Sequence, residues 1–187
     1  MKRRVLFVAY QIPPVTGAAT QRHLRYIRRL SSFGWSPIVL TCRPECTEDY
    51  ILKDQSLLEK IPADTEIYRA FSFNPMDHLL NLKAKWFNKK DRPEENRKLS
   101  ESDSASKGSG FFQFFKDFIV EIFRLPDRQI GWLPFALIRG CMVSSRQKCH
   151  VIYASGGPWT ALLTGLLVSR ITGKPFIADF RDPWVQN

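Results

Sequence analysis

The apolar positions of the chain form short runs and helical stripes that alternate along most of its length. Residues 5–10 are a continuous apolar run, which is typical of a strand buried on both faces. In residues 20–33 the apolar side chains recur at helical spacing, with Thr20 as the expected cap and Gly34 as the expected stop. Residues 35–41 are predicted to form a second strand. This order predicts a parallel strand–helix–strand unit with a right-handed crossover.

The last third of the chain repeats this arrangement. The pattern predicts a helix over residues 133–147, a strand over 151–154, a helix over 158–172 that ends at Gly173, and a strand over 176–180. Strands that alternate with helices indicate an α/β fold. We therefore expect a Rossmann-like, doubly wound parallel sheet with flanking helices, in one domain over residues 1–187.

The middle of the chain is less regular. Residues 49–60 and 76–88 read as helices and residues 67–71 as a strand. Residues 89–110 are charged and rich in serine, which predicts a flexible insertion within the domain, since neither flank could form a complete sheet. Residues 111–125 predict a phenylalanine-rich helix with a narrow polar stripe.

The charge balance narrows the range of partners. Lys and Arg number 28 against 18 Asp and Glu, a formal charge of +10, which favours anionic partners. The basic stretch at 83–98, beside the helix at 111–125, is either an anionic-membrane contact or a solvated face next to a core helix. No nucleic-acid motif accompanies the charge, so no nucleic acid is expected. Apolar runs are too short for a membrane span or a leader, which predicts a cytoplasmic protein, with the inner face of the cell membrane as a peripheral location.

Cysteine and histidine positions do not suggest a metal site. The spacings of Cys42, Cys46, Cys141 and Cys149 match neither a zinc site nor a redox pair, so reduced core thiols are expected. The three histidines are scattered and are interpreted as surface or capping residues; they are His23, His78 and His150.

Two glycine-bearing loops are candidate binding elements. Each follows a predicted strand and precedes a predicted helix, where parallel sheets bind ligands and where free helix amides favour anions. The first loop contains Gly17 and Ala18, with Arg22 available for a charge-assisted bond. The second contains Ser155, Gly156 and Gly157. The first loop matches neither a dinucleotide-binding nor a phosphate-loop motif. A plain tight turn is the alternative for both loops.

The end of the last predicted strand concentrates charged residues. Asp179, Arg181 and Asp182 precede Trp184, which could wall a pocket. Strand alternation places Asp179 and Arg181 on the opposite side from Phe180. An acid and a base at this edge could act on a substrate, or could pair with each other to fasten the loop.

Four motifs in this order resemble the N-terminal domain of GT-B glycosyltransferases of the family 4-like group. They are the segments 5–17, 126–134, 151–159 and 172–184. The resemblance implies a two-domain enzyme in which this half binds the acceptor and a C-terminal half holds a nucleotide-sugar donor, with no metal or other cofactor. Asp182 is then a candidate base or acceptor contact, with Arg181 as its orienter. Gly17 and its neighbours would face the donor diphosphate and the transferred sugar, and Ser155 to Gly157 would line the acceptor side.

The resemblance predicts transfer of a sugar to a saccharide or lipid-linked saccharide, as in cell-surface polysaccharide synthesis. The chain departs from the family where several members place a histidine, since Ser155 and Gly156 stand there. The donor domain with its paired glutamates is also absent from these residues, so we expect the 187-residue chain alone to be inactive. A carbohydrate- or anion-binding module that works with a partner chain is the alternative.

Overall fold

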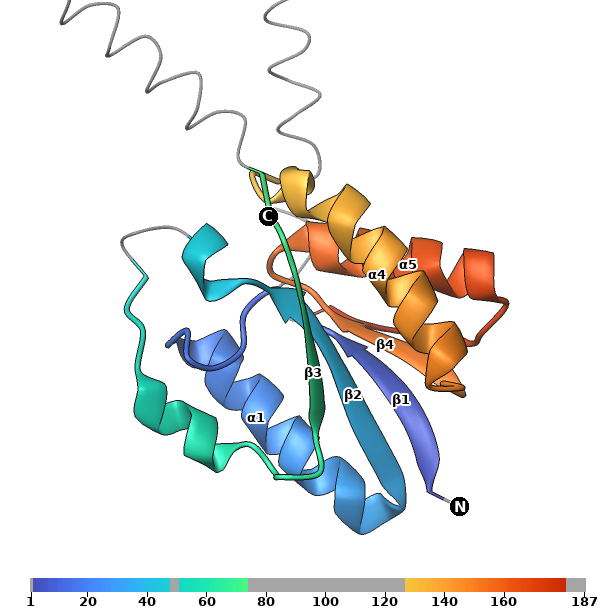
Figure 1. Ribbon diagram of the computed structural model, residues 1–187, viewed down its shortest axis with the longest axis horizontal. Coiled ribbons are helices and arrows are strands. Elements are labelled where there is room, and N and C mark those ends of the chain that lie inside the picture. The colour runs from blue at the N-terminus through green and yellow to red at the C-terminus, as the bar shows by residue number, and fades with distance from the viewer. Residues whose placement is uncertain (1, 48–50, 74–126, 181–187) are drawn as a thin grey trace, which may run out of the picture.

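The computed structural model describes residues 2–47, 51–73 and 127–180, and they form one parallel sheet. Its strands stand in the order β3-β2-β1-β4-β5, with the carboxyl ends at one edge (Figure 1). Their bounds are β1 (Arg3–Val8), β2 (Trp35–Cys42), β3 (Glu66–Ala70), β4 (Val151–Ser155) and β5 (Phe176–Asp179). The predicted α/β, Rossmann-like fold is confirmed.

Helices pack on both faces of the sheet. The helix α1 (Ala18–Leu30) lies on one face, whereas α4 (Leu133–Arg146) and α5 (Trp159–Thr172) lie together on the other (Figure 1). Short 3-10 helices complete the described elements: η1 (Ser31–Phe33), η2 (Pro44–Cys46), η3 (Gln55–Lys60) and η4 (Ile130–Trp132). Gly34 and Gly173 end their helices with φ of 76° and 66°, as predicted.

Alternation along the strands divides the core into two layers. Phe7 and Val39 point toward α1, where they pack with Ile27. Leu6 and Ile152 point the other way and join the larger core under α4 and α5, which includes the fully buried Trp132. Each central strand therefore buries both faces, which explains the continuous apolar runs of its sequence.

The structure corrects three predictions. The cap of α1 is Gly17, not Thr20, which is buried in the first turn. Residues 51–54 of the helix predicted over 49–60 are not helical, because Lys53 forms an antiparallel bridge with Val15. The only helix found in the described part of this segment is the short η3. His23 is not a surface residue, since it is 1% exposed. The predicted helices at 76–88 and 111–125 and the insertion at 89–110 lie outside the described residues.

The cysteines are free thiols, as expected. Cys42 and Cys149 are buried, whereas Cys46 and Cys141 are partly exposed. Burial raises the pKa of the Cys149 thiol to about 11, because a thiolate would lose its hydration there.

Candidate functional site

The two glycine-bearing loops leave the same edge of the sheet from neighbouring strands. The strands β1 and β4 are paired in parallel, so their carboxyl ends lie side by side. The chain after β1 turns to one face and the chain after β4 turns to the other. This is the topological switch point, the place where open parallel sheets bind ligands.

The first loop delivers an uncapped helix start to this edge. Gly17 has φ of 140° and ψ of 168°, and no side chain among the described residues caps α1. A Cβ on Gly17 would meet nothing within 4 Å, so its surroundings are open. The loop itself is held in place, since Thr16 donates both its amide and its hydroxyl to the Leu52 carbonyl at 2.9 Å. The first turn of α1 thus offers backbone donors and a partial positive charge from a fixed position.

The second loop differs, because its helix start already holds a carboxylate. The Thr160 amide donates to Asp127 Oδ2 at 2.8 Å, and the Thr160 hydroxyl donates to Oδ1. The Gln129 amide also donates to that oxygen, at 3.1 Å. Asp127 therefore caps α5 from a segment that precedes α4. Because its carboxylate already occupies backbone and side-chain donors at the start of α5, fewer donors remain there for an external anion than at the start of α1.

A cluster centred on Asp179 links the two sides of the site. The Arg22 guanidinium Nη2 lies 2.7 Å from Oδ1 and 2.9 Å from Oδ2. The Tyr153 hydroxyl donates to Oδ2 at 2.6 Å and the Ser155 hydroxyl at 3.1 Å. The Asp179 side chain is 18% exposed and that of Arg22 is 33% exposed. Both carboxylate oxygens are thus occupied, so Asp179 positions its neighbours.

Electrostatics in this cluster follow from burial and from the ion pair. The pKa of Tyr153 is raised, mainly because the side chain is buried and also because its hydroxyl is bonded to Asp179. This phenol therefore stays protonated and remains a hydrogen-bond donor. Partial burial acts to lower the pKa of Arg22, but contacts with Tyr26 and Asp179 leave it raised. The guanidinium lies over the Tyr26 ring at 5.4 Å, which further fixes its direction.

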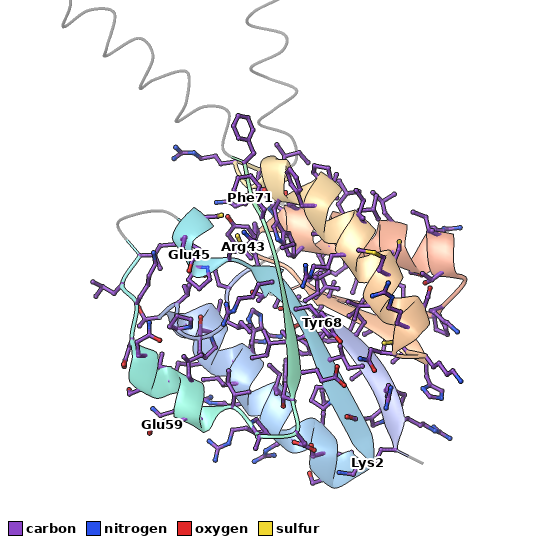
Figure 2. The ribbon with its side chains drawn as sticks, viewed as in Figure 1. Lys2, Arg43, Glu45, Glu59, Tyr68 and Phe71 are labelled. Atoms are coloured by element: carbon purple, nitrogen blue, oxygen red, sulfur yellow. The ribbon has the colours of Figure 1, made fainter. Side chains whose placement is uncertain are left out.

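A second set of charged and aromatic side chains lies at the same edge, after β2 and β3. Arg43, Glu45 and Phe71 are at this end of the sheet, whereas Lys2 is at the opposite end (Figure 2). Arg69 donates from Nη2 to the Pro13 carbonyl at 2.8 Å, and its burial lowers the pKa of its guanidinium. This contact ties the end of β3 to the loop that precedes α1.

The structure brings several of the predicted site residues together. Arg22 and Ser155 meet on Asp179, while Gly17 and Ala18 begin the helix that carries Arg22. Gly156 donates its amide to the Asp179 carbonyl at 2.8 Å, and Gly157 has φ of 76°. Arg181 and Asp182 lie outside the described residues.

Sequence reasoning did not assign the roles of Asp179, Tyr153 and Asp127. The sequence did contain a signal for Asp179, because a carboxylate at the end of a buried strand needs a hydrogen-bond or charged partner. Its strand neighbour is Ser155, by parallel register. Asp127 gave no such signal, since a proline–aspartate pair before a helix is common turn chemistry.

The described residues contain no group of three or more His, Cys, Asp or Glu side chains arranged to hold a metal ion. None of the helices in the described ranges is long and apolar enough to cross a bilayer. No protein-family model matches the chain, and no curated protein matches it at a significant level.

Proposed function

We propose that this chain is the acceptor-side domain of a GT-B glycosyltransferase, which moves a sugar from a nucleotide-sugar donor to a saccharide or lipid-linked saccharide. The observation that carries the proposal is the uncapped start of α1 at the switch point, beside the Arg22–Asp179 pair. The four ordered sequence motifs supply the reaction class. Cell-surface polysaccharide synthesis, at the cytoplasmic face of the membrane, is the setting that fits such acceptors.

The proposed chemistry rests on positioning and on the leaving group. The amides at Gly17 and Ala18 would contact the donor diphosphate, where a helix terminus stabilises negative charge as the glycosidic bond breaks. Ser155 and Gly156 would line the acceptor side. Asp179 holds Arg22 and Ser155 in place, and is a positioning residue. Asp182 is the proposed base or acceptor contact, oriented by Arg181.

A binding experiment on the chain itself tests the site. Amide NMR spectra would be recorded while a uridine diphosphate sugar, free uridine diphosphate or an oligosaccharide is added. The proposal predicts shifts at Gly17 and Ala18 with the diphosphates, and at Gly156 and Gly157 with the oligosaccharide. Gly34 is the internal control, since it is a positive-φ glycine at the opposite edge of the sheet. Shifts confined to Gly34 and its neighbours would overturn the proposed site.

A transfer experiment tests the reaction. Radiolabelled sugar should not be transferred by the 187-residue chain alone, and transfer should require a polypeptide that carries a donor-binding domain. In the complete enzyme, Asp182→Asn should lower turnover by about a hundredfold and leave folding intact. Unchanged turnover would remove Asp182 from the mechanism. Turnover by the chain alone would refute the division of labour between two domains.

A non-catalytic carbohydrate- or anion-binding module is the second candidate. The uncapped start of α1 supports it equally, because a helix terminus can bind an anion without any proton transfer. Under this alternative the NMR shifts would appear as described, but no partner polypeptide would restore transfer. The two experiments together therefore separate binding from catalysis.

A further inference from the structure

A groove of about 640 Å³ runs along the face of the sheet beside α1. Its floor is formed by side chains of three neighbouring strands, among them Val5, Val151 and Ile177. Its wall is the side of α1 that carries Tyr26 and Leu30. The groove does not include the two glycine-bearing loops, and it meets the candidate site at Asp179, Tyr153 and Tyr26.

The groove exposes apolar surface that a parallel sheet normally buries. Ile177 is 51% exposed, and Phe33, which lines the groove next to the start of β2, is 75% exposed. On the opposite face, the same strands β4 and β5 are covered by α5. All-parallel sheets are stable with helices over both faces, so this half-face lacks a helical layer among the described residues.

The shape of the groove fits a helix that lies parallel to α1. In strand register its lining runs from the level of Trp35, which pairs with Arg3, to that of Asp179, one position beyond the level shared by Val8 and Ala178. The lining therefore follows the strands for about 20 Å, which matches a helix of about 13 residues. Such a helix would contact α1 along one side and the strands below.

The charge of the rim indicates what kind of helix fits. Arg29 lines the groove, and Arg25 lies one turn before it on the exposed side of α1. The sequence of α1 contains four arginines and no acidic residue. A second copy of the chain would bring the same arginines and a formal charge of +10, so self-association is electrostatically disfavoured.

We propose that the groove is the docking site for an amphipathic α-helix of a partner protein, with acidic residues along the edge that lies against α1. The apolar face of that helix covers the exposed side chains of Ile177 and Phe33, above the buried Val5 and Val151. Its carboxylates pair with Arg25 and Arg29, whose charges set the direction and register of docking.

Fluorescence anisotropy with synthetic peptides tests this proposal. The probe is a labelled amphipathic helix of about 14 residues with a leucine face and glutamates on one edge, made in each heptad register. A matched peptide replaces the glutamates by lysines. We expect saturable, micromolar binding of the acidic peptide, about tenfold tighter than that of the basic one, with the difference lost at about 0.5 M salt.

Variants locate the interaction on the groove. Ile177→Asp should abolish binding, while Ile171→Asp should not, because Ile171 is a comparably exposed isoleucine (63% against 51%) that lies on α5, away from the groove. The double variant Arg25→Glu, Arg29→Glu should reverse the preference and bind the lysine peptide. Circular dichroism melts would check that each variant folds.

Three outcomes would overturn the proposal. The first is equal affinity for the acidic and basic peptides, or no binding of either in any register at about millimolar peptide. The second is a dimer, seen in sedimentation velocity and lost in Ile177→Asp, which would make the groove a self-association surface. The third is binding to phosphatidylglycerol vesicles that Ile177→Asp abolishes while the peptides do not compete, which would make it a lipid-contact surface.

Discussion

Arg22, in the second turn of α1, holds Asp179 at the end of β5, with 2.7 Å between Nη2 and Oδ1. The two residues are 157 positions apart in the sequence. Between them lie the carboxyl ends of β1 and β4, with Tyr153 as a further donor to the same carboxylate. This contact joins the first helix to the last described strand at the edge where the site is proposed.

Replacing the carboxylate should therefore weaken the fold as well as the site. Asp179→Asn removes the partner of a partly buried guanidinium and turns one acceptor into a donor that faces Arg22, Tyr153 and Ser155. We expect a loss of about 2 kcal/mol in the free energy of unfolding, measured in urea. Asp64→Asn is the control, since its pair with Lys2 spans 3.8 Å and is more than half exposed. Equal losses in both variants would contradict the structural role of Asp179.

Asp127 should contribute as a helix cap. Asp127→Ala leaves the Thr160 amide at the start of α5 without its acceptor, which should cost about 1–2 kcal/mol in urea unfolding. Asp54→Ala provides the comparison, because Asp54 caps only the short, exposed η3 through the Ser56 amide and should cost clearly less. A smaller loss at Asp127 than at Asp54 would show that α5 does not depend on this cap.

Gly17 should be required for its backbone conformation. Gly17→Ala places a Cβ in open space but at φ of 140°, a region that other residues rarely adopt, so we expect a loss of about 1–3 kcal/mol. Gly34→Ala is matched, because it also sits in open space at positive φ but at the opposite edge. Both variants should lose stability, whereas only Gly17→Ala should weaken binding of a nucleotide diphosphate in titration calorimetry. Equal affinity in both variants would exclude the α1 start as the anion site.

Stability should fall in alkaline solution because of Cys149. Burial raises the pKa of this thiol in the folded state to about 11, whereas an unfolded cysteine titrates near about 8.5. The folded state then binds more protons than the unfolded state between these values, so the free energy of unfolding decreases as pH rises through this window. The expected loss is about 3 kcal/mol from pH 8 to pH 11.

The Cys149 contribution is isolated by comparing variants. Urea unfolding at several pH values should show a shallower alkaline decline for Cys149→Ala than for the unchanged chain. Cys46→Ala should retain the full decline, since Cys46 is only partly buried. Identical slopes in all three proteins would assign the alkaline effect to other groups.

The sequence by itself determined the order and type of most elements. Apolar runs and helical spacing are local properties, so the strands β1, β2, β4 and β5 and the helices α1, α4 and α5 were predicted within a few residues of their observed bounds. The stops at Gly34 and Gly173 were equally local, because only glycine adopts their left-handed conformation without strain. These features together fixed the parallel α/β class.

The tertiary structure decided which distant groups meet. The helix α1 begins after Gly17 and not at Thr20, and the loop before it is bridged to Lys53, a contact that no local pattern encodes. The pairing of Arg22 with Asp179 and the capping of α5 by Asp127 arise from sheet order and helix placement. Such contacts compensate the desolvation of charged groups wherever the fold brings them, so their partners are set by three-dimensional packing and not by spacing along the chain.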